Sequence, residues 1–257
     1  MFGMPLLLRC LVSRHPTGPS PSHFEACLIL EVKIHTIIDR RMVVSTLSSP
    51  KVRNVLAQLR EDASSDAEEW EKYQNQVATN RTTADLNALV RLGNLYLAVS
   101  EEEGELLYFL ARLVGAKRLV EFGASFGVST LYLAAAAADN GGHLVTTEVH
   151  PDKCRAIRRH LKAAQLDSFV TLLEGDARKT LSNLSSPVDF LLLDGWKSMY
   201  LPVLELLQKK LSPRALICAD NYRHEAAASY LKHVQQSDSG MITHFFEDMA
   251  VSCYDLR

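Results

Sequence analysis

The chain has 257 residues, of which 47% are hydrophobic, enough for one domain with a full core and modest appendages. Its 28 basic and 30 acidic residues leave a net charge of -2, which argues against nucleic acid or an anionic membrane surface as a partner. The five cysteines are scattered without a C-x-x-C pair, and no apolar run approaches the roughly 20 residues needed to span a bilayer. These features predict reduced thiols in a cytoplasmic protein, with neither a disulfide framework nor a zinc site.

Residues 1–48 are expected to form an extension outside the main domain. The stretch up to Phe24 contains two arginines and no acidic residue, and Pro16, Pro19 and Pro21 interrupt any helix. We interpret this segment as a poorly ordered tail, or as sequence upstream of a start at Met42. A targeting peptide is the alternative.

Two helices are predicted ahead of the first strand. Ser49 followed by Pro50 is typical of a helix N-terminus. A second helix is predicted near Ser100, where three glutamates would occupy the first turn and suit the helix dipole. Between the two helices, Trp70 and Tyr73 are expected to anchor a polar segment. The buried stripe of the second helix is expected at Leu106, Leu107, Leu110, Leu113 and Val114.

Beyond residue 117 the pattern alternates between strands and helices. Strands are predicted at 118–122, 143–148, 169–173, 188–193 and 215–219, with helical patterns between them. Such alternation is typical of a parallel sheet with helices on both faces. Two further strands, 241–246 and 249–254, are joined so tightly that they must be antiparallel. The chain is therefore predicted to be α/β, with residues 49–257 as one domain that consists of cap helices (49–116) and an α/β core (117–257).

The stretch from Leu119 to Ala138 joins a buried strand, a glycine turn and an alanine-rich helix. Gly123 and Gly127 allow a sharp turn and the close approach of a ligand, as in nucleotide-binding α/β proteins. The spacing is E-x-G-x-x-x-G instead of G-x-G-x-x-G, which indicates a nucleoside ligand without a pyrophosphate. Glu121 in the strand is interpreted as part of the ligand site, with capping of backbone N–H groups as the alternative.

Polar residues also follow the other strands, where open α/β sheets bind their ligands. Glu148 could accept both hydroxyls of a ribose, although Glu148 and Asp176 could each be helix caps instead. Asp194, Asp220 and Asn221 follow two strands that would lie ~4.8 Å apart, so their oxygens could bind one hard cation such as Mg²⁺. Helix capping does not require two carboxylates and an amide together, which favours the metal interpretation.

The chain from about Leu97 to its end resembles the cation-dependent, catechol O-methyltransferase-like group of the class I S-adenosylmethionine-dependent O-methyltransferases. The motifs that carry the resemblance are VEFGASFGVST, TTEVHPDK, LEGDA, FLLLDGWKSMYLP and ICADN. The D-x-W-K-x-x-Y-L-P pattern is the most specific of them. The resemblance implies a Rossmann-like, seven-stranded methyltransferase sheet with an antiparallel last strand, helices on both faces and N-terminal cap helices.

The resemblance also implies a role for each residue of the site. Mg²⁺ or another divalent cation would be held by Asp194, Asp220 and Asn221, and Lys197 would be the general base. Gly195 stands where the catechol enzymes have a histidine. S-Adenosylmethionine would be bound at its methionine end by Glu121, Gly123, Ser125 and Ser129, at the cap edge by Val99 and Ser100, at the ribose by Glu148, at the adenine by Asp176 and Ala177, and beside the metal by Asp194.

The resemblance thus implies a metal-dependent O-methyltransferase that acts on one hydroxyl of a small catechol-like aromatic acceptor. The metal would bind two adjacent oxygens of the acceptor and lower the pKa of one hydroxyl, and Lys197 would remove the proton. A NAD-dependent Rossmann oxidoreductase is the first alternative, but it does not explain why Asp194 accompanies Asp220 and Asn221. A non-catalytic methyltransferase-like binding protein is the second. Apolar surface on the N-terminal helices and the final hairpin predicts a two-fold homodimer.

Overall fold

The computed structural model describes residues 45–66, 93, 95–184 and 187–255. The predicted extension up to residue 44 and the predicted anchors Trp70 and Tyr73 lie outside the described residues. Residues 46–48 form a short 3-10 turn, η1 (Thr46–Ser48), whose Thr46 N–H donates to the Asp139 carboxylate at 3.1 Å. The domain boundary at residue 48 stays a prediction.

Both predicted N-terminal helices are present, and serine caps each of them. Ser49 accepts a hydrogen bond from the Val52 N–H at the start of α3 (Pro50–Asp62), which continues into η2 (Ala63–Ser65). Ser100 opens α6 (Glu101–Leu113) with a capping box: its hydroxyl accepts from the Glu103 N–H, and the Glu103 carboxylate accepts from the Ser100 N–H. Local sequence therefore sets where each helix begins.

The predicted buried stripe of α6 is only partly correct. Gly104, Leu107 and Ala111 are buried, at a spacing of three and four residues, and form the row that packs inward. Leu113 lies two positions beyond Ala111, about 200° around a helix of 3.6 residues per turn, so it points away from the packed face. Its side chain is 68% exposed, and Val114 is 39% exposed.

The sheet has seven strands within the described part of the chain, in the order β3-β2-β1-β4-β5-β7-β6. Strands β1 to β5 pair in parallel, and β7 pairs antiparallel with β5 on one side and β6 on the other. The predicted seven-stranded sheet with a reversed last strand is therefore confirmed. The strands are β1 (Arg118–Phe122), β2 (His143–Glu148), β3 (Val170–Glu174), β4 (Val188–Leu193), β5 (Leu211–Ala219), β6 (Met241–Phe246) and β7 (Met249–Tyr254).

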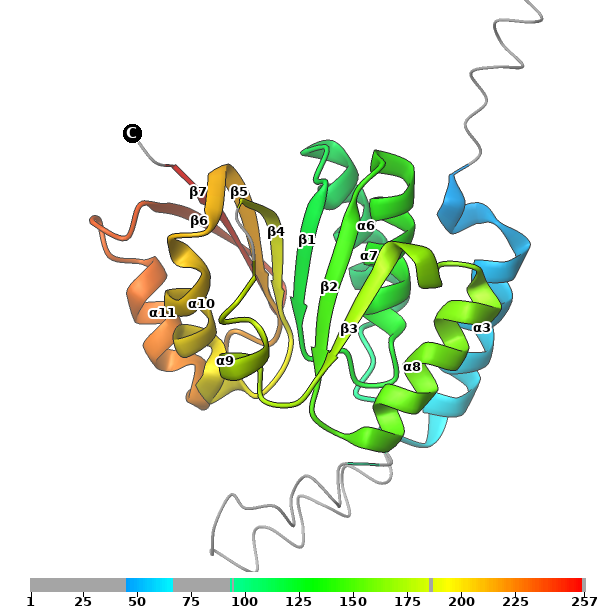
Figure 1. Ribbon diagram of the computed structural model, residues 1–257. Coiled ribbons are helices and arrows are strands. Elements are labelled where there is room, and N and C mark those ends of the chain that lie inside the picture. Colours follow the sequence, from blue (N-terminus) through cyan, green and yellow to red (C-terminus); the bar gives the residue numbers. More distant parts are fainter. Residues whose placement is uncertain (1–44, 67–92, 94, 185–186, 256–257) are drawn as a thin grey trace, which may run out of the picture. The chain divides into compact units, whose positions relative to one another are not determined.

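Helices cover both faces of the sheet (Figure 1). On one face lie α6, α7 (Val128–Asn140) and α8 (Pro151–Ala164), with α3 packed beside α8. The other face carries α9 (Ala177–Thr180), α10 (Tyr200–Gln208) and α11 (Ala228–Val234). No helix among the described residues has the length and apolar character needed to cross a membrane. The remaining 3-10 turns are η4 (Asp167–Phe169), η5 (Lys197–Met199) and η6 (Glu225–Ala227).

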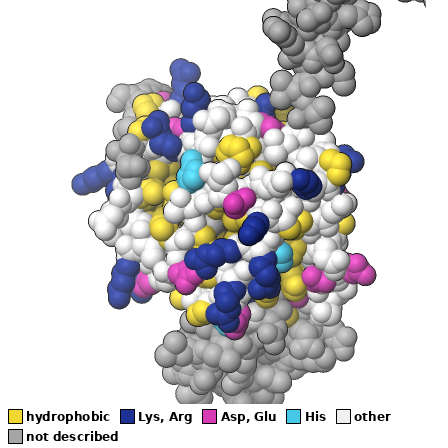
Figure 2. Space-filling view, turned by 45° about the vertical axis from the view of Figure 1, so that its right-hand side comes forward, with side chains coloured by type: hydrophobic (Ala, Val, Ile, Leu, Met, Phe, Trp, Pro, Cys, Tyr) yellow, Lys and Arg dark blue, Asp and Glu magenta, His cyan; other side chains and the backbone are white. Residues whose placement is uncertain are grey.

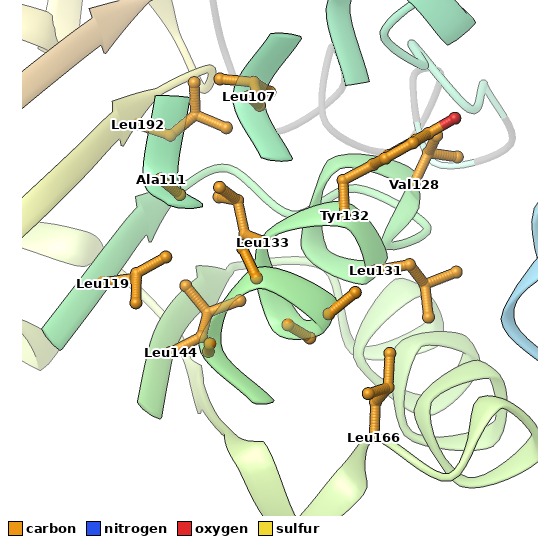
Figure 3. Close-up of a cluster of buried hydrophobic side chains, with 14 of the residues drawn as sticks. Leu107, Ala111, Leu119, Val128, Leu131, Tyr132, Leu133, Leu144, Leu166 and Leu192 are labelled. Atoms are coloured by element: carbon orange, nitrogen blue, oxygen red, sulfur yellow. The ribbon is translucent and has the colours of Figure 1, made fainter. Parts of the chain in front are cut away.

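The alanine-rich helix α7 lies at the centre of the larger hydrophobic core. Its alanines from Ala134 to Ala137 are fully buried, and its Leu133 lies among Leu119, Leu144 and Leu192 of the strands (Figure 3). Small side chains let the helix lie close to the sheet. A second hydrophobic core lies on the α10 face of the sheet. The two cores together hold the strands in place from both faces of the sheet.

Candidate active site

The predicted site residues gather at the carboxyl edge of the central strands. Phe122, the last residue of β1, is in register with Leu193 of β4, and Leu193 is in register with Ala219 of β5. The residues that follow these three positions are Gly123, Asp194 and Asp220, so the strand pairing alone brings them side by side. The order of the strands thus places three of the predicted site residues next to one another.

Two positions in the turn after β1 require glycine because of their backbone conformation. Gly123 and Gly127 have φ angles of 98° and 92°, in the left-handed region. A Cβ on Gly123 would lie 2.5 Å from the Cα of Gly195, so the turn packs backbone to backbone against the segment after β4. A Cβ on Gly195 would lie 2.5 Å from the Phe122 ring. The ring therefore occupies the space that a histidine at residue 195 would need.

Glu121 is fully buried within the sheet. Its Oε2 accepts hydrogen bonds from the hydroxyls of Thr130 (2.6 Å) and Thr146 (2.5 Å), so the carboxylate joins β1 to β2 and to the first turn of α7. Burial raises the pKa of Glu121, and the hydrogen bonds from Thr130 and Thr146 oppose that shift. Its Oε1 has no hydrogen-bond partner among the described residues. That oxygen is free to accept a bond from a ligand.

Glu148 connects the end of β2 to the glycine turn. Its Oε1 accepts from the N–H groups of Val149 and His150, and its Oε2 accepts from the Ser125 N–H, each at 2.8 Å. The carboxylate therefore braces the loop before α8 and the turn after β1 at once. Its role toward a ribose stays a prediction.

Asp176 is the N-cap of α9, as the alternative interpretation of the sequence predicts. Its carboxylate accepts from the Arg178 N–H at 2.9 Å and pairs with the Arg178 guanidinium at 2.6 Å. The Arg178 side chain holds the pKa of Asp176 below its usual value. Ala177 beside it is buried. Contact of Asp176 and Ala177 with an adenine stays a prediction.

Val99 and Ser100 lie at the start of α6. The Ser100 hydroxyl accepts the bond that caps the helix, and Val99 is half-buried against the larger core. The cap edge is thus present where the sequence predicted it. Contact of these two residues with a cofactor stays a prediction.

Lys197 points between the largely buried carboxylate of Asp194 and the buried carboxylate of Asp220, at the ends of β4 and β5. Its Nζ lies 3.4 Å from Asp194 Oδ1 and 3.6 Å from Asp220 Oδ2. The same Nζ donates to the Tyr200 hydroxyl at 2.8 Å, and that hydroxyl donates to the Asp220 carbonyl at 2.9 Å. Burial raises the pKa of Asp194 and of Asp220, and the positive charge of Lys197 opposes both shifts. The structure therefore brings together the predicted base and two of the predicted metal ligands.

Asp220 offers an oxygen that would suit a hard cation. Asp220 is 6% exposed, and its Oδ1 has no hydrogen-bond partner among the described residues. A buried carboxylate oxygen without a partner is costly unless a ligand supplies one. No group of three His, Cys, Asp or Glu side chains suited to a metal occurs in the described ranges. The predicted set is of a different kind, because its third member is the amide of Asn221, an exposed residue directly after Asp220.

A cavity of about 480 Å³ lies between the first turn of α6 and the hairpin of β6 and β7. Ala219 of β5 is in register with Ala250 of β7. Because these strands are antiparallel, Met249, which lies in the wall of the cavity, is next to Asp220. The cavity therefore lies on the side of the sheet edge where the two aspartates end their strands. The residues that line it are Glu102, Glu103, Leu106, Phe245, Phe246, Glu247 and Met249.

Two polar residues at the site were not assigned a role from the sequence. Tyr200 belongs to the D-x-W-K-x-x-Y motif. Its position three residues after Lys197 is the feature of the sequence that could have indicated a contact between the two side chains. Lys153 belongs to the TTEVHPDK motif, but nothing in that motif shows that its side chain is buried. Its Nζ donates to the Ser125 hydroxyl at 2.9 Å, directly behind the glycine turn.

The order and directions of the seven strands give the chain the fold of solved methyltransferases. Residues 120–222 match a protein family described as a methyltransferase domain. The chain is 32% identical over 142 residues to a catechol O-methyltransferase of Niastella koreensis, and the match covers 54% of this chain and 64% of that protein. It is 28% identical over 154 residues to the catechol O-methyltransferase of Bos taurus, with 57% and 56% covered. The chain thus spans less than two thirds of the length of these curated relatives.

Solved structures support the same fold. An O-methyltransferase from Bacillus cereus in complex with SAH has a TM-score of 0.57 at 18% identity, and the match covers 77% of this chain and all of that one (100%). The O-methyltransferase TomG from Streptomyces achromogenes in complex with SAM has a TM-score of 0.55 at 23% identity, with 73% and 98% covered. The chain therefore has the fold of these O-methyltransferases, residues 120–222 match a methyltransferase domain, and the curated relatives cited above are named catechol O-methyltransferases.

Proposed function

We propose that this chain is an S-adenosylmethionine-dependent O-methyltransferase that needs a divalent cation and methylates one hydroxyl of a small catechol-like acceptor. The observation that carries the proposal is the position of Lys197, 3.4 Å from the carboxylate of Asp194 and 3.6 Å from that of Asp220, beside the glycine turn. A NAD-dependent dehydrogenase would account for the glycine turn, but it would not account for a lysine placed between the carboxylates of Asp194 and Asp220. The family matches also favour the methyltransferase interpretation over a NAD-dependent oxidoreductase.

The residues suggest how the reaction would proceed. Asp194, Asp220 and Asn221 would hold the cation, which would lower the pKa of an acceptor hydroxyl bound to it. Lys197, as the neutral amine, would take the proton from that hydroxyl and become an ammonium group, and Tyr200, which accepts a hydrogen bond from its Nζ, would keep the amine aimed at the acceptor. The oxygen would then attack the methyl group on the sulfonium of S-adenosylmethionine, and both charges would be neutralised as the methyl moves. A dry, rigid site favours such a step.

The cavity beside α6 would give room for the aromatic acceptor. Its apolar wall of Leu106, Phe246 and Met249 suits a ring, and it adjoins the strand end that carries Asp220. The glutamates in its lining, Glu102 and Glu247 among them, would favour an acceptor without an acidic group.

Removal of the metal tests the proposal most directly. EDTA should abolish methylation of a catechol, and added Mg²⁺ should restore it, while binding of S-adenosylhomocysteine in calorimetry should survive EDTA. A matching mono-phenol should not react, because it offers only one oxygen to the cation. Full activity in EDTA would contradict the metal-dependent mechanism. A protein that binds S-adenosylhomocysteine but methylates neither compound would support the non-catalytic alternative.

Substitution of the base tests its assigned role. Lys197→Ala should lower kcat by about 10²–10⁴, the usual effect of losing a general base, with little change in cofactor affinity. Lys197→Arg should not restore the rate, because a guanidinium does not release its proton at working pH. Lys209→Ala, at an exposed lysine just after α10, is the matched control. A Lys197→Ala enzyme as fast as wild type would rule out this base.

We also propose that the protein works in the cytoplasm. Cys154 and Cys218 are buried free thiols, and Cys253 is a partly exposed one. Burial raises the pKa of the Cys154 thiol to about 12, so this thiol stays protonated and unreactive at neutral pH. Such thiols suit a reducing compartment.

A further inference from the structure

Lys153 is buried where a lysine is unfavourable. It lies in the first turn of α8, where the helix dipole repels a positive charge, and it is only 5% exposed. The other basic side chains of α8 behave as expected of a charged helix face: Arg155, Arg158, Arg159 and Lys162 are all exposed. Lysine and arginine side chains gather on the face of the molecule shown in Figure 2. Specific contacts must therefore offset the burial of Lys153.

The contacts of Lys153 join two segments that are distant in the sequence. Its Nζ donates to the Leu95 carbonyl at 2.8 Å and to the Ser125 hydroxyl at 2.9 Å, both neutral oxygens. It also lies 5.2 Å from the centre of the Phe126 ring, within cation–π range. Burial lowers the pKa of Lys153, and the negative charges of Glu148 and Asp66 oppose that shift.

Ser125 is the point at which these contacts meet the glycine turn. It has a φ of 48°, a left-handed conformation that costs energy for a residue with a side chain. Three bonds hold it there: its N–H donates to Glu148, its hydroxyl donates to the Tyr96 carbonyl at 2.6 Å, and the same hydroxyl accepts from Lys153. The Tyr96 ring stacks on Phe126 with 4.2 Å between ring centres. Lys153 thus supports a strained turn from behind.

We propose that Lys153 is a positioning residue that holds the glycine turn and the Leu95–Tyr96 segment in fixed register, and so preforms the site for the cofactor. The inference rests on the proposed S-adenosylmethionine site. Lys153 acts through Ser125 and, by way of the Ser125 N–H, on Glu148. Without the ammonium group, the Ser125 hydroxyl loses one of its two partners and the strained conformation loses support.

The first test measures the turn in the protein without ligand, so it does not depend on the proposed function. In Lys153→Met, backbone amides of residues 123–127 and 95–97 should exchange hydrogen at least tenfold faster than in wild type, while those of α10 stay unchanged. Lys162→Met, which removes an exposed lysine from the same helix, should exchange like wild type. Unchanged exchange in the turn of a folded Lys153→Met protein would overturn the proposal. If Lys153→Met does not fold, Ser125→Ala should show the same local acceleration, and its absence there would be equally decisive.

The second test separates positioning from general stability by a double-mutant cycle. Calorimetry with S-adenosylhomocysteine, well below the melting temperature of each variant, should show at least tenfold weaker binding for Lys153→Met and for Ser125→Ala. The double variant should be within twofold of the weaker single variant, because both changes break the same connection. Losses that multiply, or an unchanged affinity in Lys153→Met, would overturn the proposal. Wild-type protein that does not bind S-adenosylhomocysteine would refute the proposed function, and the exchange test would still decide the role of Lys153.

Discussion

At the scale of single residues, Glu121 shows that a site can be built at the expense of stability. Its carboxylate is fully buried, and one of its two oxygens has no partner within the described residues. Hydroxyl donors reduce the cost of burial but do not remove it, since the pKa of Glu121 stays raised. Such a group persists only where the surrounding packing holds it.

We therefore expect Glu121→Gln to stabilise the protein above pH 5. The folded pKa of Glu121 lies above its ordinary value of 4.5, so its contribution to stability is greatest below that pH and is lost as pH rises through the folded pKa. A neutral amide with its oxygen in place of Oε2 keeps both threonine bonds. Each kcal/mol gained should raise Tm by about 2–4 °C.

Scanning calorimetry between pH 5 and pH 8 checks this expectation. The gain in Tm of the variant over wild type should grow with pH. Glu205→Gln, at an exposed glutamate of α10, should show no such trend. A lower Tm for Glu121→Gln at every pH would mean that the hydrogen bonds of the carboxylate outweigh its burial.

Substitution of Glu148 tests whether this carboxylate is needed for ligand binding. Glu148→Ala should weaken binding of S-adenosylhomocysteine by about 1–3 kcal/mol, the scale for losing a hydrogen-bonded charged partner. Calorimetric titration measures the loss directly. Glu174→Ala, at the residue of β3 that is in register with Glu148, is the control. An unchanged affinity would show that Glu148 only braces the loop before α8.

The sequence predicts which residues stand at the strand ends but not what each side chain contacts there. Asp194 and Asp220 could be placed together because parallel pairing brings strand ends to one edge. Asp176 could not be assigned, since an acid after a strand suits a helix cap and a ligand equally well. The burial of Lys153 escaped prediction because its partners, Leu95 and Ser125, lie far away in the sequence and one of them is a backbone carbonyl.

At the scale of elements, the contact between α6 and α7 depends on a single missing side chain. An ideal Cβ on Gly104 would lie 2.2 Å from Cε2 of the buried Tyr132 ring. Alanine normally favours a helix by about 1 kcal/mol over glycine. Here the clash should outweigh that preference, because overpacking a close helix contact costs about 1–3 kcal/mol.

Gly104→Ala should therefore lower the free energy of unfolding, as measured in urea. Adding Tyr132→Leu to the Gly104→Ala chain should recover part of the loss, because it removes the atoms that clash. Glu105→Ala, at an exposed neighbouring position, should change little. A more stable Gly104→Ala protein would show that α6 can move away from α7 at low cost.

Helix starts were more predictable than buried faces. Ser49 and Ser100 cap their helices through contacts within one turn, which sequence alone reveals. The buried face of α6 depends on where α7 can approach closely, which is at Gly104. Leu113 lies on the other side of the helix from the row that contains Gly104, and it is therefore exposed although hydrophobic periodicity predicted it to be buried. Strand β5 begins at Leu211, earlier than the predicted residue 215, because its first residues pair beside a register shift in β4.

At the scale of the whole molecule, exposed apolar side chains on α6 and β6 suggest self-association. Phe109 and Leu113 are 57% and 68% exposed, and Ile242 and Phe246 are 67% and 45% exposed. Strand β6 is an edge of the sheet, and its unpaired backbone groups could join a second copy. We propose that these two elements form the contact of a two-fold dimer.

Sedimentation velocity at micromolar concentration tests the dimer. Wild type should sediment as a dimer, and Ile242→Glu should sediment as a monomer with unchanged secondary structure, because a charge would be buried in the contact. Ala226→Glu, at an exposed position of η6, should remain a dimer. A wild-type protein that sediments as a monomer would contradict the proposed dimer.

The placement of β7 between β5 and β6 has a consequence for how the protein is made. The ribosome releases β5 and β6 before β7, yet β6 pairs only with β7 among the described strands, and β5 has no neighbour on that side until β7 arrives. A nascent chain stalled before Met249 would thus present β5 as a bare, largely apolar edge next to the strand end that carries Asp220. Strand β7 therefore closes the sheet, and a chain that lacks it should be recognised by chaperones as unfinished even though it already contains most of the site residues.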